Sequence, residues 1–96
     1  MFKKIIEQVR ETQYTGEVDV KVNIPGEFCT DDETVDGVYH LELRFDEDDQ
    51  LVEYASSVRF FEQQDGETFD PGITFSELHT LDHGSFEIIE IEPLGN

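Results

Sequence analysis

Carboxylates are the side chains of this sequence with the most chemistry to offer. The chain has 24 Asp and Glu against six Lys and Arg, a formal charge of −18 on 96 residues. Asp46, Glu47, Asp48 and Asp49 follow one another in the stretch FDEDDQ. Carboxylates in this number can attract cations, transfer protons or stand in for phosphate groups. Solubility alone needs a much smaller net charge, so the excess calls for a separate explanation.

One acidic stretch has a superficial likeness to a calcium loop. In DEDDQLVEY, Asp46 and Asp48 occupy positions 1 and 3 of such a loop. Leu51 replaces the glycine required at position 6, and Ser57 replaces the glutamate at position 12. The pattern therefore fails at both diagnostic positions.

The histidines and the cysteine offer little more. His79 and His83 are spaced to share one face of a helix, with Asp82 beside them, but Thr80 stands where an HExxH zinc site has Glu. Cys29 is the only cysteine and has no basic neighbour in the sequence to activate it. A glycine-rich phosphate loop is also missing. We therefore expect no enzyme, no metal and no cofactor.

Length and composition indicate one acidic α+β domain over residues 1–96. The apolar fraction is only 36%, but it includes eight Phe and three Tyr in patterned positions, which favours a folded chain over a disordered acidic tail. The N-terminal apolar stretch is only Ile5 and Ile6 before Glu7, too short for a secretion signal. No stretch is long enough to span a membrane. We expect a cytoplasmic location, in the host cytoplasm if a phage encodes the chain.

The elements that must position the acids begin with an amphipathic helix in MFKKIIEQVRETQY, residues 1–14. Its apolar residues recur at helical spacing, and half of the basic residues of the chain lie on its other faces. The apolar residues are Phe2, Ile5, Ile6 and Val9.

Three strands should follow, at residues 15–25, 38–45 and 51–61, because apolar and polar residues alternate there. Pro25 and Gly26 are expected to end the first, and residues 46–50 to form the hairpin turn between the second and third. The residues expected to face the core are Val18, Val20, Val22 and Ile24, then Tyr39, Leu41, Leu43 and Phe45, then Val52, Tyr54, Val58 and Phe60.

The C-terminal part predicts a short helix over residues 74–84, because Thr74 and Glu77 form a capping-box pattern. The last strand, residues 85–94, changes apolar phase midway, which indicates a bulge. The fold class is therefore α+β, with an N-terminal helix packed on a mainly antiparallel four-stranded sheet and a short second helix before the last strand.

An antiparallel meander would bring two acidic loops, residues 25–37 and 62–73, to the same end of the sheet. We take these acids and those of the hairpin turn as the candidate partner-binding residues. They are Asp31, Asp32, Glu33 and Asp36, then Glu62, Asp65, Glu67 and Asp70, then Asp46, Glu47, Asp48 and Asp49. Glu27 would join the first loop. The polar strand face between the two ends is expected to add Glu17, Asp19, Glu42, Glu53 and Glu87.

These features favour a nucleic-acid mimic, most simply of DNA, that blocks the basic groove of a nucleic-acid-binding protein such as a restriction enzyme, a CRISPR effector or a toxin nuclease. In size and charge the chain is similar to small phage-encoded anti-restriction and anti-CRISPR proteins and to acidic immunity proteins, although no motif carries over residue by residue. The expected partner is a basic protein, without direct binding of nucleic acid or membrane.

Two alternatives stay open. One is an ordinary domain whose acidic surface is adapted to high salt, and the other is an acidic binding module for a basic protein that does not bind nucleic acid. The sequence leaves open which protein is the target, whether DNA or RNA is copied and whether the chain forms a homodimer.

Overall fold

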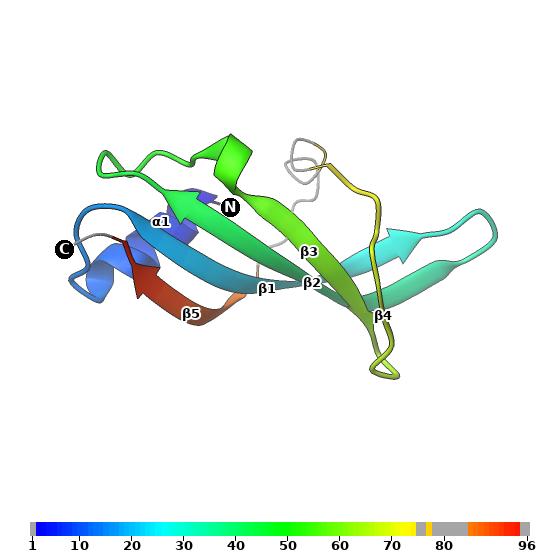
Figure 1. Ribbon diagram of the computed structural model, residues 1–96. Helices are drawn as coiled ribbons and strands as arrows, with labels where there is room; N and C mark the ends of the chain where they lie inside the picture. Colours follow the sequence, from blue (N-terminus) through cyan, green and yellow to red (C-terminus); the bar gives the residue numbers. More distant parts are fainter. Residues whose placement is uncertain (1, 75–76, 78–84, 95–96) are drawn as a thin grey trace.

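The computed structural model describes residues 2–74, 77 and 85–94, and within them it has one α-helix and one antiparallel sheet (Figure 1). Helix α1 spans Phe2–Glu11. The strands are β1 (Val18–Cys29), β2 (Thr34–Phe45), β3 (Ser57–Gln63), β4 (Thr68–Phe69) and β5 (Glu87–Pro93), and a 3-10 turn, η1, spans Glu53–Ala55. The strand order is β4-β3-β2-β1-β5. The α+β class with its N-terminal helix is confirmed, but the sheet has five strands and not four.

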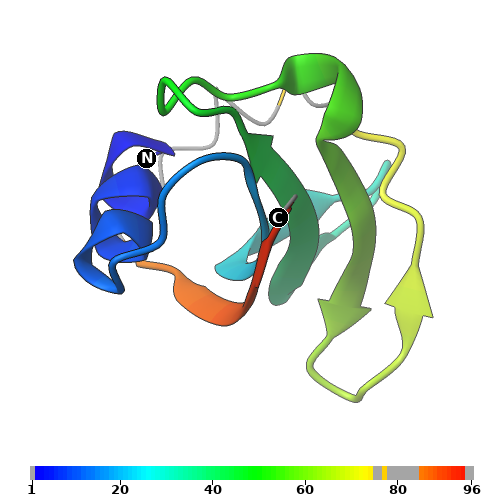
Figure 2. The same cartoon turned by 60° about the vertical axis from the view of Figure 1, so that its left-hand side comes forward.

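The core lies between α1 and one face of the sheet, which we call the inner face. Ile5 and Val9 of α1 are buried against the alternate residues of β1 and β2 that the sequence assigned to the core. Figure 1 shows α1 at the end of the sheet where β1 begins and β5 ends, and Figure 2 shows the helix to one side of the sheet. The helix is therefore anchored at one end of the sheet only.

The β1–β2 hairpin is much longer than predicted. The two strands pair continuously from Val18↔Phe45 to Cys29↔Thr34, so the predicted loop over residues 25–37 is wrong. Pro25 does not end β1, because β5 pairs only as far as Asn23, and a proline is tolerated where its missing N–H would face an open edge. The end of this hairpin, which we call the arm (residues 27–36), extends beyond β5 and β3 (Figure 1).

A close approach of β3 to β2 occurs at the base of the arm. A Cβ atom added to Gly37 would lie 2.2 Å from the carbonyl oxygen of Glu62 and 2.7 Å from the ring of Phe61. Both atoms belong to a packed strand that cannot easily yield. Glycine at position 37 therefore allows β3 to pack closely where the arm begins.

The third strand differs from its prediction in phase. Tyr54, expected inside, is 95% exposed in η1, and Phe60, also expected inside, lies opposite His40 on the other face of the sheet. A register shift between His40 and Leu41 leaves one extra residue in β3, so that Val58 and Phe61 both face the core. A strict alternation could not anticipate this bulge.

The short strand β4 was not predicted, because a strand of two residues is too short to show an alternation of apolar and polar residues. It pairs with Phe61 and Glu62, so part of the predicted loop over residues 62–73 is a hairpin. The turn at residues 46–50 is confirmed, with the Asp46 amide donating to the Gln50 carbonyl at 2.9 Å.

The C-terminal predictions have mixed outcomes. The bulge in the last strand is confirmed by the register shift opposite Lys21 and Val22. The Glu77 amide donates to the Thr74 hydroxyl at 3.2 Å, as a helix cap would require. The rest of the predicted second helix, residues 75–76 and 78–84, lies outside the described residues.

Truncating Phe69 tests whether the short strand β4 is held by its ring. The ring packs against Phe28 and Phe61 with centroids 5.1 and 5.3 Å apart. We expect Phe69→Ala to lower the free energy of unfolding by about 2 to 3 kcal/mol in urea titrations followed by circular dichroism. Tyr54→Ala, the same truncation at an exposed ring, should change it by less than about 0.5 kcal/mol. Equal losses in the two variants would contradict this packing role.

Candidate functional site

Four aromatic rings join the arm to the β3–β4 hairpin. Phe28 of the arm contacts Phe61 and Phe69, and Tyr39 contacts Phe61 edge-on with ring centroids 4.7 Å apart. The Tyr39 hydroxyl donates to the Glu27 carbonyl at 2.6 Å. The cluster fixes the positions of two hairpins that are far apart in sequence.

These two hairpins carry nine carboxylates, which we call the acidic end. Residues 22–43 and 60–96, which include both hairpins, contain no Lys or Arg. The members of the acidic end are Glu27, Asp31, Asp32, Glu33, Asp36, Glu62, Asp65, Glu67 and Asp70. All but Glu62 belong to exposed residues.

The two acidic hairpins lie side by side. A hollow of about 350 Å³ between them is lined by Glu33 and Asp36 from the arm and by Gln63 and Asp65 from the other hairpin, among others. In Figure 1 both turns lie at the end of the sheet away from α1. The structure thus brings together the two acidic segments that the meander was expected to bring together, although both are hairpins and not loops.

The turns of the acidic end are held by their own hydrogen bonds. In the arm, the Thr30 amide donates to the Glu33 carbonyl at 2.8 Å, and the Glu33 amide donates to the Thr30 hydroxyl at 3.1 Å. In the other hairpin, Asp65 accepts from the Glu67 amide at 2.9 Å. These hydrogen bonds hold the backbone of both turns, so the points from which the acidic side chains extend are fixed relative to one another.

The hairpin turn at residues 46–50 is a different environment. Asp46 accepts from the amides of Asp48 and Gln50, both at 2.9 Å, and Asp49 forms an ion pair with Arg10 of α1. Arg10 also donates to the Asp46 carbonyl at 3.3 Å. Two of the four predicted carboxylates of this turn therefore hold the fold, and the turn lies at the α1 end, away from the acidic end (Figure 1).

The face of the sheet opposite α1, which we call the outer face, is not the acidic row that the sequence suggested. Arg44 donates two hydrogen bonds to Asp19, of 2.8 and 3.2 Å. These hydrogen bonds and the negative charge of Asp19 raise the pKa of Arg44 above its ordinary value. Two further ion pairs are Arg59–Glu42 at 3.0 Å and Lys21–Glu90 at 3.1 Å. Half of the basic residues are thus used to neutralise this face.

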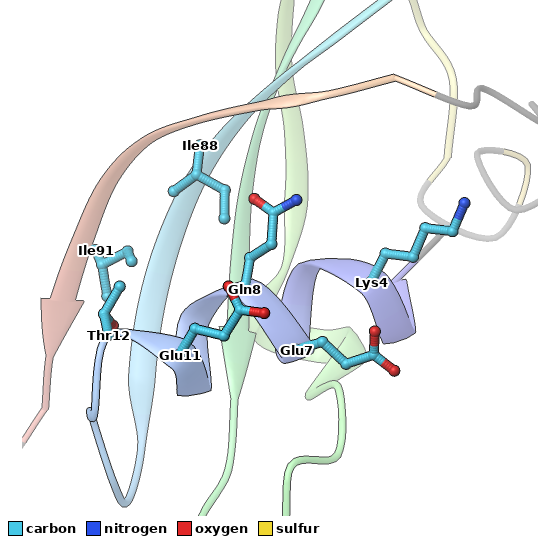
Figure 3. Close-up of a pocket in the computed structure, with 7 residues that line it drawn as sticks. All are labelled: Lys4, Glu7, Gln8, Glu11, Thr12, Ile88 and Ile91. Atoms are coloured by element: carbon cyan, nitrogen blue, oxygen red, sulfur yellow. The ribbon is translucent and has the colours of Figure 1, made fainter.

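A groove of about 850 Å³ lies between α1 and β5 (Figure 3). Its polar groups come from one flank of the helix, and Ile88 and Ile91 line its sheet side. It contains neither histidine nor cysteine, so it does not resemble a nucleophile–base site. The residues of the helix and its C-terminal end that line this groove are Lys4, Glu7, Gln8, Glu11 and Thr12.

No metal site is found among the groups considered for chemistry that lie in the described part of the chain. Among residues 2–74, 77 and 85–94, no three His, Cys, Asp or Glu side chains are placed to hold a metal ion. Cys29 is exposed in the arm, with its sulfur 3.9 Å from the Thr34 hydroxyl. His79, Asp82 and His83 lie outside the described residues. No helix in the described part of the chain is long and apolar enough to cross a membrane.

No family model matches this chain, and comparisons with curated proteins and with solved structures also find no match.

Sequence reasoning missed the composition of the outer face. His40 and Phe60 stack there with ring centroids 4.2 Å apart, and Ile89 is 53% exposed. Phe60 was assigned to the core by alternation, which fails at the bulge in β3. The one usable indication was that Lys21 and Arg44 occupy the polar positions of predicted strands.

The alkaline limit of stability tests the Tyr39 hydrogen bond. Burial, and to a lesser extent the charge of the Cys29 thiolate, raise the pKa of Tyr39 above its ordinary value of 10.0. The unfolded chain loses this proton first, so the contribution of Tyr39 is intact below pH 10 and is lost as the pH rises. The free energy of unfolding should therefore fall as the pH rises above about 10, over the interval from about pH 10 to about pH 12.

The variant Tyr39→Phe lacks the ionising hydroxyl and should lose less stability over this interval, although it starts about 1 kcal/mol lower. Tyr54→Phe, at an exposed hydroxyl, should keep the wild-type pH dependence. Parallel curves for wild type and Tyr39→Phe, measured by urea titration, would show that Tyr39 does not contribute.

Proposed function

We propose that this protein is a nucleic-acid mimic that blocks the basic groove of a nucleic-acid-binding protein. One observation carries the proposal: nine carboxylates lie on two hairpins at one end of the sheet, in stretches of chain without Lys or Arg. The candidate targets are the classes that use such grooves, namely restriction enzymes, CRISPR effectors and toxin nucleases. The mimic needs no catalytic residue of its own.

The physical basis is the way such grooves gain affinity. A basic groove binds a duplex by neutralising phosphates, which repeat about every 3.4 Å along each strand. Alternate residues of a β-strand are about 6.7 Å apart and neighbouring strands are about 4.8 Å apart. Carboxylates on a fixed hairpin pair can therefore approximate a subset of phosphate positions, and charge complementarity also speeds association.

The positions of the acidic residues decide which surface we assign to partner binding. The turn at residues 46–50 was an equal candidate in the sequence, but Arg10 offsets part of its charge. The ion pairs of the outer face offset the acids there. We therefore assign the main binding surface to the acidic end.

The first experiment captures the target. The protein is immobilised, exposed to a lysate of the source or host cell at about 0.15 M salt, and eluted with a salt gradient. We expect one nucleic-acid-binding protein in near-stoichiometric amount, displaced by added duplex. Many basic proteins eluting together at low salt would contradict a specific mimic, and a single partner that duplex does not displace would favour the acidic binding module.

The second experiment assigns the surface with two variants of equal charge change. The first carries Asp31→Asn, Asp32→Asn, Glu33→Gln and Asp65→Asn, and the amide at position 65 keeps the oxygen that accepts in the turn. We expect it to bind the captured target at least about tenfold more weakly, with a flatter dependence on salt.

The matched control removes four carboxylates at the other end of the molecule, by Glu7→Gln, Glu11→Gln, Glu47→Gln and Asp48→Asn. It should retain affinity within a factor of about three, since rim charges contribute little individually. Equal losses in the two variants would mean that total charge, and not the acidic end, determines binding. A salt-adapted domain would instead show no target and would unfold at low salt.

A further inference from the structure

The outer face has the composition and arrangement of a protein–protein interface. Its centre contains the His40–Phe60 stack and the exposed Ile89 around a hollow of about 220 Å³. Lys21 and Arg59 line the same hollow, and their side chains are 44% and 51% exposed. Aromatic and apolar groups ringed by charged pairs are typical of protein–protein contact surfaces.

Charges alternate in sign across this face. Lys21 of β1 lies opposite Glu42 of β2 on one side and opposite Glu90 of β5 on the other. Ser57 of β3 is the residue opposite Glu42, and Arg59, the extra residue of the β3 bulge, extends the row through the hydrogen bond that its side chain donates to Glu42. The row therefore reads positive, negative, positive, negative from β3 to β5.

A two-fold axis parallel to the strands, between β1 and β2, would make this row complementary to itself. A second copy placed face to face about that axis puts its β1 over β2 of the first and its β5 over β3. Lys21 of each copy then meets Glu42 of the other, and Arg59 meets Glu90. A two-fold axis across the strands would instead place like charges on like.

The row next to it contains two unsatisfied polar atoms. Asn23 and His40 are cross-strand neighbours on β1 and β2. Asn23 Oδ1 and His40 Nε2 are buried without a hydrogen-bond partner in the described part of the chain, and the nearest carboxylate oxygen to Nε2, Glu62 Oε2, is 3.9 Å away. The same two-fold axis places Asn23 of one copy opposite His40 of the other.

We infer that a second copy of this chain docks on the outer face about a two-fold axis parallel to β1 and β2. The charge distribution favours this occupant, because two chains of charge −18 repel each other through most of their surfaces, and this face is compensated by three ion pairs. The inference does not depend on the proposed function. The axis also directs both arms the same way, so the repulsion between the two acidic ends opposes association. Because salt screens this repulsion, the test is made at about 0.15 M salt.

Charge reversal at the two central positions provides the test. The wild-type protein should sediment with twice the chain mass of 11.1 kDa. Lys21→Glu places Glu opposite Glu42 of the partner, and Glu42→Lys places Lys opposite Lys21 of the partner, so each variant alone should sediment as a single chain. An equimolar mixture of the two should form a heterodimer of twice the chain mass, because both central contacts then join opposite charges.

Matched controls carry the same charge changes away from the outer face. Lys4→Glu and Glu47→Lys, both at exposed positions, should remain dimeric. Recovery of the dimer on mixing also shows that both reversed chains are folded.

Two results would overturn the inference. One is a single-chain mass for the wild type from about 1 μM to about 1 mM, which would place any dissociation constant above the range relevant to a specific dimer. The other is a dimer that survives Lys21→Glu and Glu42→Lys individually, which would place the interface elsewhere on the chain.

Discussion

Aromatic packing at the base of the arm opposes the repulsion of the charges that the hairpins carry. Two carboxylates about 7 Å apart in water repel by about 0.6 kcal/mol, and physiological salt reduces this by about half. Nine of them in two neighbouring turns give a total of a few kcal/mol. Each ring of the Phe28, Tyr39, Phe61 and Phe69 cluster contributes about 1.5 to 3 kcal/mol when fully buried, with more from ring–ring contacts. Tyr39 and Phe61 are fully buried and Phe28 and Phe69 partly so, and their packing is therefore large enough to offset this repulsion.

The few cations are placed where the fold needs them. Arg10 joins the end of α1 to the turn at residues 46–50, and Lys21, Arg44 and Arg59 neutralise the outer face of the sheet. Each is close to acids that would otherwise repel across adjacent strands. The acidic end lies in stretches of chain with no Lys or Arg, so its charge is held by apolar packing and by backbone hydrogen bonds within the turns. The nine carboxylates of the acidic end thus carry half of the net charge of −18.

The sequence predicted best those elements whose pattern is local and regular. The helix and the paired halves of β1 and β2 follow from unbroken periodicities, and the turn at residues 46–50 from its composition. Pro25 was wrongly predicted to end a strand. Whether β1 can accommodate a proline there depends on how far β5 extends along it, which is a property of the tertiary structure. Phe60 was misplaced because a bulge in β3 shifts the phase by one residue.

The candidate site was predictable in position but not in detail. That two acidic segments share one end of the sheet follows from antiparallel connectivity, which the spacing of the strands already implied. Which acids are neutralised depends on register: Glu42 meets Arg59 only because β3 carries an extra residue, and Asp49 meets Arg10 only because α1 packs beside that turn. Charge pairing between distant segments cannot be read from composition.

The acidic end and the outer face are separate surfaces, and this separation has a mechanical consequence. The arm extends beyond β5, and the hollow between the two acidic turns is lined by none of the residues that carry the alternating row on the outer face. A contact on the outer face would therefore leave the two turns of the acidic end accessible, and because an axis parallel to the strands keeps both arms pointing the same way, it would bring two acidic ends close together. A groove that binds a duplex extends over many phosphates, whereas one arm with its neighbouring turn presents few. Pairing of two chains would lengthen the charged surface without adding carboxylates to either chain. The pair could then match an extended groove, while the repulsion within each small domain stays below the stabilisation that its aromatic cluster provides.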